Sequence, residues 1–158
     1  MWWRLTHWQF EEQKGERNRK ALERIVQSGE IPGLLAYQGN EPIGWVCVGP
    51  RERLTRLARS KILAPVDDQP VWSVVCFFIE KRARTRGVAT ALLEAAVNYA
   101  WENGARIVEG YPAPDPAAKI PDAFAWTGLE TIFERAGFQL ALRRGKSRSI
   151  WRRQKATS

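Results

Sequence analysis

The stretch from Val71 to Gly104 decides the fold of this chain. It consists of VWSVVCFFI (71–79), EKRARTRGVAT (80–90) and ALLEAAVNYAWENG (91–104). The first part is a continuous apolar run rich in β-branched and aromatic residues, which predicts a strand buried on both faces. The third part repeats its apolar residues at helical spacing, and Gly104 is a typical helix stop. The stretch therefore predicts a strand, a short basic turn and a helix.

The basic turn has the features of an anion-binding site. The first turn of a helix presents backbone N–H groups without internal partners, and the helix dipole adds partial positive charge there. Gly87 has no Cβ, so the backbone can approach a ligand closely, while Arg82, Arg84 and Arg86 add positive charge. The turn therefore predicts a pyrophosphate site. The alternative is an ordinary strand–turn–helix joint with a solvated basic turn.

Sequence motifs narrow the choice among phosphate-binding loops. The chain contains neither the GxxxxGK[ST] string of a P-loop nor the GxGxxG string of a dinucleotide fold. It contains Arg84-x-x-Gly87-x-Ala89, which resembles the Gln/Arg-x-x-Gly-x-Gly/Ala signature of the GNAT-type N-acetyltransferase superfamily. A second string, FERAGF (133–138), is similar to one near the C-terminus of that family.

The remaining elements agree with this resemblance. Apolar spacing and turn residues predict helices at 16–28 and 129–136, and strands at 34–37, 43–48, 106–111, 138–142 and 149–152. Thr127-x-x-Glu130 predicts a capping box for the later helix, and the prolines within 112–124 predict an irregular loop that forms a lid or substrate wall. The order resembles the acyl-CoA N-acyltransferase (GNAT) fold. That fold is α/β (α+β), with a mixed, mostly antiparallel central sheet flanked by helices, here in one domain over residues 1–158.

The resemblance implies an enzyme that transfers an acetyl group from acetyl-CoA to a primary amine, by direct attack within a ternary complex. The acceptor is then an unidentified small molecule or peptide. The backbone of Phe78 and Ile79 would pair with the pantetheine arm in a gap between two strands. The pyrophosphate would be held by Arg84, Thr85, Arg86, Gly87, Val88, Ala89 and Thr90.

Three residues are candidates for the proton transfers. Glu109 and Glu80 are candidate bases because each is expected at or near a strand end beside the cleft. Phe133 stands where many family members have the tyrosine that protonates the departing thiolate, so Tyr111 is the candidate acid. Each has a structural alternative: an ion pair for either glutamate and a core position for Tyr111. Cys76 as an acetylated nucleophile is a further alternative, against its expected place in the core.

The N-terminal segment departs from the family pattern. The usual first strand and two helices barely fit before the hairpin at 34–48. Either Trp2 to Leu5 forms a short first strand, or the chain begins inside the domain.

Composition leaves two other functions open. The net charge of +8 suits an anionic cofactor, but it also suits a nucleic-acid module that uses Arg51–Lys61 and Arg143–Arg153. The basic residues are scattered over several elements and no RNA-binding motif is present, which argues against nucleic acid. The missing tyrosine leaves open a non-catalytic acetyl-CoA sensor.

Further expectations come from residue usage. One histidine and two cysteines, Cys47 and Cys76, argue against a metal site and a disulfide. The apolar runs are too short to span a bilayer and no signal peptide is evident, which favours the cytoplasm and no membrane partner. A homodimer through a sheet edge or the C-terminal hairpin is left open.

Overall fold

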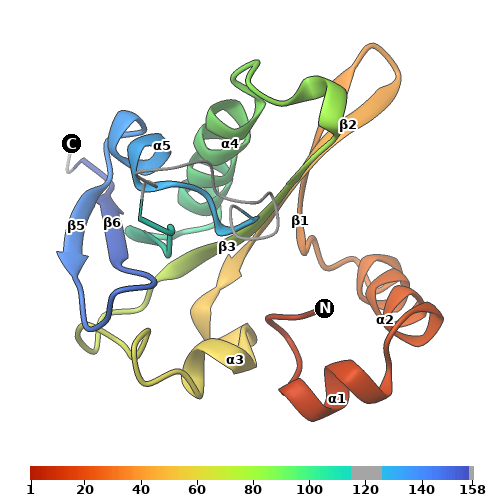
Figure 1. Ribbon diagram of the computed structural model, residues 1–158, viewed down its shortest axis with the longest axis horizontal. Coiled ribbons are helices and arrows are strands. Elements are labelled where there is room, and N and C mark those ends of the chain that lie inside the picture. Colours follow the sequence, from red (N-terminus) through yellow and green to blue (C-terminus); the bar gives the residue numbers. More distant parts are fainter. Residues whose placement is uncertain (115–125, 157–158) are drawn as a thin grey trace.

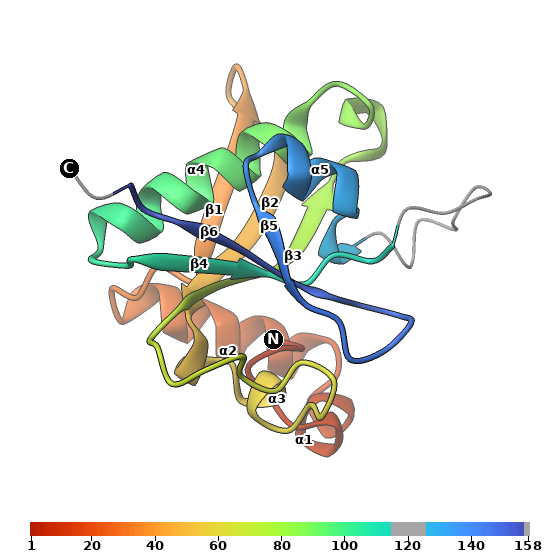
Figure 2. The same ribbon diagram turned by 90° about the vertical axis from the view of Figure 1, so that its left-hand side faces the viewer.

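A computed structural model describes residues 1–114 and 126–156 (Figures 1 and 2). Its centre is a six-stranded sheet with strand order β1-β2-β3-β4-β6-β5, in which only the β3–β4 pair is parallel. The strands are β1 Gly33–Gln38, β2 Glu41–Pro50, β3 Trp72–Ile79, β4 Ile107–Gly110, β5 Gln139–Leu142 and β6 Ile150–Gln154. The expected mixed, mostly antiparallel sheet is confirmed.

Helices cover both faces of this sheet. They are α1 His7–Glu12, α2 Glu16–Gln27, α3 Thr55–Ala58, α4 Val88–Glu102 and α5 Glu130–Arg135, with 3-10 turns at Arg51–Arg53 and Lys81–Ala83. Figure 2 shows α4 and α5 on one face and α1, α2 and α3 on the other. Among the described residues, no helix combines the length and apolar character needed to cross a membrane.

Each face of the sheet has its own apolar core. The α4 face buries Val74, Leu93, Val97 and Phe133 completely. The opposite face buries a second cluster made of strand residues, α3, the segment after it and the N-terminal tryptophans: Trp3, Cys47, Leu54, Leu57, Leu63, Val75, Tyr111 and Ile150. The stretch 51–63, which includes the basic residues considered for nucleic-acid binding, therefore contributes three leucines to a core.

The parallel strands β3 and β4 are paired over only three residues each. Trp72 to Val74 of β3 face Val108 to Gly110 of β4, after which β4 ends and β3 continues to Ile79. The end of β3 stays paired with β2 on one side, but on its β4 side the backbone groups have no strand partner in the described chain. The two strands thus part in the middle of the sheet.

Two local expectations are wrong. Trp2 to Leu5 forms a turn, and the first element is α1, which Thr6 opens with a capping box to Gln9. The later helix begins at Glu130 with Leu129 as its cap, and no side-chain cap is present. Thr127 instead is buried and its hydroxyl accepts a hydrogen bond from Arg148.

Candidate functional site

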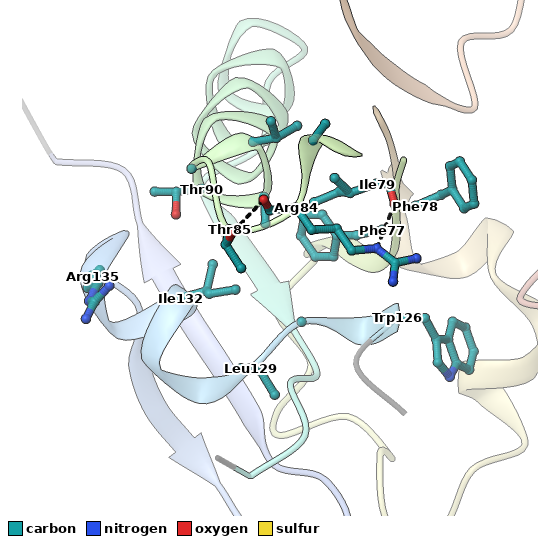
Figure 3. Close-up of a pocket in the computed structure, with 15 residues that line it drawn as sticks. Phe77, Phe78, Ile79, Arg84, Thr85, Thr90, Trp126, Leu129, Ile132 and Arg135 are labelled. Atoms are coloured by element: carbon teal, nitrogen blue, oxygen red, sulfur yellow. Dashed lines mark hydrogen bonds between the residues drawn. The ribbon is translucent and has the colours of Figure 1, made fainter. Parts of the chain in front are cut away.

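A pocket of about 510 Å³ lies where β3 and β4 part (Figure 3). It is bounded by the end of β3, the turn that follows, the first turn of α4, and the segment that leads into α5. Its lining residues are Phe77, Phe78, Ile79, Ala83, Arg84, Thr85, Gly87, Val88, Ala89, Thr90, Trp126, Gly128, Leu129, Ile132 and Arg135. Eight of the nine predicted cofactor residues are among them, and Arg86 is not.

The turn exposes the N-terminus of α4 to this pocket. Gly87 caps the helix in a left-handed conformation, with φ of 80°, and offers no side chain to the first-turn N–H groups. A Cβ built on Gly87 would meet nothing within 4 Å, so the space in front of it is open. Thr85 also has a positive φ of 61°, which is rare for a β-branched residue and indicates local strain. A helix N-terminus open to solvent in this way suits an anion.

Two arginines line the pocket. Arg84 extends from the turn, and its Nε donates a hydrogen bond to the backbone oxygen of Ile79 at 3.1 Å (Figure 3). Arg135 lies in the last turn of α5, where Figure 3 places it on the same side of the pocket as Thr90. Arg135 belongs to the FERAGF string, which by itself predicts no binding role for this residue.

The other end of the pocket is apolar. Phe78 is 64% exposed although it is a large apolar residue at the end of a central strand. Phe77, Leu129 and Ile132 continue this surface, and Trp126 stands across from Arg84 (Figure 3). An exposed apolar surface beside a cationic turn matches a ligand with an anionic end and a less polar arm.

Glu109 and Tyr111 lie outside the lining of this pocket. Glu109 Oε2 accepts hydrogen bonds from Arg51 Nη1 at 3.1 Å and from the Tyr111 hydroxyl at 2.8 Å, and its Oε1 accepts one from Arg152 Nε at 2.8 Å. Ser73 Oγ is 2.7 Å from the same hydroxyl. Both Glu109 and Tyr111 are fully buried. Burial, with the nearby Glu109 carboxylate, raises the pKa of Tyr111 well above its usual range. The arrangement matches the structural alternatives, which are an ion pair for Glu109 and a core position for Tyr111.

The other catalytic candidates also lie outside the lining. Glu80 forms an ion pair with Arg82 at 2.8 Å. Cys76 faces Cys47 across β2 and β3, and the pKa of its thiol is raised by the contact with Cys47 and by burial. Phe133 is fully buried, with its ring against Gly110 and Gly128. None of the described lining residues is a carboxylate, a histidine or a tyrosine.

Sequence reasoning did not identify the wall formed by Trp126, Gly128, Leu129 and Ile132. These residues are brought to the pocket by the return of the chain across β4, as the bridge between Ala113 and Leu129 shows. The capping-box interpretation of Thr127-x-x-Glu130 assigns this segment to the start of a helix and not to a pocket wall. The only available signal was the FERAGF string, which lies directly after this wall.

Comparisons with known proteins agree with the geometry. A sequence model described as the acetyltransferase (GNAT) family matches residues 2–118. A GNAT-family acetyltransferase structure from Listeria monocytogenes has a TM-score of 0.58 and 9% identity, over 95% of this chain and 77% of the other. A Bacillus subtilis acetyltransferase in complex with CoA has a TM-score of 0.51 and 10% identity, over 89% and 86% of the two chains.

A ribosomal-protein-alanine N-acetyltransferase from Brucella melitensis is also similar, with a TM-score of 0.51 and 16% identity over 90% of this chain and 78% of the other. No curated protein sequence matches. The structural similarities show the fold, and the sequence model covers most of the chain. This protein therefore belongs to the GNAT acetyltransferase family.

Proposed function

We propose that the protein binds acetyl-CoA in the pocket between β3 and β4 and transfers the acetyl group to a primary amine of an acceptor. The observation that supports this best is the joint presence, in one pocket, of an uncapped helix N-terminus at Gly87 and an end of β3 that lacks a strand partner on its β4 side. The first suits a pyrophosphate, and the second suits an extended arm that pairs with a strand.

The chain offers distinct groups for each part of this ligand. The N–H groups of Val88, Ala89 and Thr90 and the cation of Arg135 suit the phosphates. The backbone at Phe78 and Ile79 suits the pantetheine arm. Because Arg84 Nε already donates to the Ile79 oxygen, the Arg84 side chain has to move if the arm pairs with that oxygen.

Acetyl-CoA supplies an activated acyl group, and the residues of the pocket then orient it and exclude water. The attacking amine must lose a proton. Since the described lining residues include no carboxylate or imidazole, we assign this proton to solvent water. We assign Glu109 and Tyr111 to the support of the strand junction, where both are fully bonded and buried.

The described lining has no acid or base groups, and this also favours a second candidate function, that of a sensor that binds acetyl-CoA without transferring the acetyl group. A nucleic-acid role receives less support, because several arginines of its basic stretches are already in ion pairs. These are Arg51, Arg143, Arg152 and Arg153.

Calorimetric titration with acetyl-CoA tests the binding step. We expect wild-type binding in the micromolar range, roughly −8 kcal/mol, and loss of binding in Gly87→Glu, where a carboxylate would enter the open space before the helix. Gly39→Glu is the matched control, because Gly39 also has a positive φ, of 62°, with nothing within 4 Å of a Cβ, and it lies outside the pocket. Equal binding by all three proteins, or by none, would contradict the proposed site.

Release of free CoA thiol with a panel of primary amines then separates enzyme from sensor. An enzyme releases thiol in proportion to amine and yields the acetylated amine by mass spectrometry. A protein that binds acetyl-CoA tightly but shows no amine-dependent release across the panel supports the sensor.

A further inference from the structure

Arg148 is a half-buried cation beside the pocket wall, and it has no carboxylate partner among residues 1–114 and 126–156. Its Nη1 donates to the hydroxyl of Thr127, and its Cζ lies 5.5 Å from the centre of the Trp126 ring. Trp126 and Gly128, on either side of Thr127, both line the pocket. The guanidinium is thus held beside the wall segment that contains Trp126, although Arg148 itself is not among the described lining residues.

The described carboxylates on neighbouring elements already form ion pairs with other arginines. Glu109 binds Arg51 and Arg152, and Asp67 binds Arg152 at 2.6 Å. Glu130, the acidic residue nearest to Thr127 in the sequence, accepts from Arg143 at 2.6 Å and from Ser149 at 2.5 Å. Within residues 1–114 and 126–156, Arg148 forms no ion pair.

Removing this guanidinium from water has a cost. Burial lowers the pKa of Arg148, and no acid of the described chain opposes that effect. Buried charges are usually paired, and a cation beside an indole recovers only part of the free energy that it loses on leaving water. A guanidinium has five N–H donors, and one hydrogen bond to Thr127 leaves most of them for a ligand.

A second arginine, Arg56, also lies beside a tryptophan and has no acidic partner among the described residues. Trp126 contacts Trp3 with ring centres 5.5 Å apart and Trp2 with ring centres 6.4 Å apart. Arg56 lies over Trp2 at 3.6 Å, and its Nη2 is buried without a hydrogen-bond partner. Burial lowers the pKa of Arg56 as well, with no acid among the causes. The aromatic end of the site therefore adjoins two cations that lack an acidic partner in the described chain.

We propose that Arg148, beside Trp126, binds an oxyanion of the acceptor, so that the acceptor is an amine that also bears a carboxylate or a phosphate. This rests on the proposed function for the identity of the pocket. The phosphates of the acetyl donor are expected at the other end, at the first turn of α4 and Arg135, so two separate anion sites serve the two substrates.

The indole N–H signal of Trp126 in a proton–nitrogen NMR spectrum reports on this site without any reaction. The signal is assigned with Trp126→Phe. We would titrate propionate and, separately, inorganic phosphate into the wild type, Arg148→Gln and Lys146→Gln. Lys146 is exposed in the same β5–β6 loop, so its replacement removes an equal charge from that loop and leaves the contact of Arg148 with Trp126 in place.

We expect a saturable shift of the Trp126 signal in the wild type and in Lys146→Gln, with at least one of the two anions. In Arg148→Gln the apparent dissociation constant should rise about tenfold or more, as is typical for a lost charge-assisted hydrogen bond. No saturable shift in the wild type, or an equal one in Arg148→Gln, overturns the proposal. The anion that gives the tighter response identifies carboxylate or phosphate.

Matched amines provide the second measurement. We expect amines with a carboxylate, such as phenylalanine, or with a phosphate, such as phosphoethanolamine, to be acetylated with a higher kcat/KM than neutral phenylalaninamide or phenethylamine. Arg148→Gln should remove the preference. Equal rates for charged and neutral amines overturn the proposal. Calorimetry with acetyl-CoA on the same samples separates a failure of the donor site from a failure of the acceptor site.

Discussion

The ring of Phe133 lies directly against the backbone of Gly110, at the end of β4. A Cβ at Gly110 would be 1.9 Å from Cε1 of Phe133 and 2.6 Å from its Cζ. Gly128 is close to the other edge of the same ring, where a Cβ added to it would be 2.8 Å from Cε2. The ring thus fills the space between the end of β4 and the segment that leads into α5, and these contacts hold the pocket wall in place.

Gly110→Ala is therefore expected to destabilise the protein. The added methyl group overlaps a fully buried ring that has no room to move, and overpacking of this kind costs about 1–3 kcal/mol or more. Urea unfolding measures the change. Gly49→Ala is the control, because Gly49 is a buried glycine of β2 whose Cβ would meet nothing within 4 Å. Equal stability of the two variants would contradict the packing role.

Phe133→Tyr is expected to lower stability and to leave acetyl transfer no faster. The family's tyrosine would be restored, but the Phe133 ring is fully buried and Phe133 is not among the described residues that line the pocket. A new hydroxyl there is crowded and lacks a partner, which costs about 1–3 kcal/mol. Thermal unfolding and thiol release measure the two effects. A higher kcat with unchanged stability would show that the para position reaches the reacting thiolate.

Elements that are consecutive in the chain could be predicted from the sequence, whereas contacts between distant segments could not. The apolar run 71–79, Gly87 and the helix after it are consecutive in the chain, so their spacing predicts a strand, a turn and a helix, and the structure has a strand, a turn and a helix in that order. Anion binding by the turn stays a prediction. Trp126 and Arg148 meet only because the chain returns across β4 and the β5–β6 loop folds beside that segment. Such contacts depend on tertiary packing and leave no periodic signal. The same holds for Glu109, whose two arginines come from distant elements.

Glu109→Gln is expected to act on stability more than on chemistry. Removing the carboxylate charge leaves Arg51 without its acidic partner in a mostly buried place, and breaking a buried ion pair costs about 3–5 kcal/mol. Tyr111→Phe should cost less, about 1 kcal/mol, since it removes hydrogen bonds without leaving a charge unpaired. Folded Glu109→Gln with normal stability but a large loss of kcat would instead support its role as the base.

Arg135→Gln is expected to weaken acetyl-CoA binding by roughly three- to fivefold, since an exposed charge contributes up to about 1 kcal/mol. Arg86→Gln is the matched control, because Arg86 belongs to the conspicuous basic turn but lies outside the pocket lining. The effect of Arg135→Gln should shrink at high salt as screening increases. A larger loss of acetyl-CoA affinity in Arg86→Gln than in Arg135→Gln would contradict the assignment of Arg135 to the phosphate end of the pocket.

The ion pair of Asp67 with Arg152 gives an expectation for acid stability. The hydrogen bonds from Arg152 are the main cause that lowers the pKa of Asp67 to about 2, below its ordinary value. A lowered carboxyl pKa stabilises the folded state fully above the unfolded pKa of about 3.9, and this contribution is lost as the pH falls through the folded pKa. Asp67→Asn should therefore reduce the loss of stability between about pH 4 and pH 2 and leave the trend from pH 6 to 8 unchanged. Denaturant unfolding across this range measures it, with Asp68→Asn as the control because Asp68 forms no ion pair with the described residues. If the free energy of unfolding falls equally between pH 4 and pH 2 in wild type and Asp67→Asn, the ion pair does not form in solution.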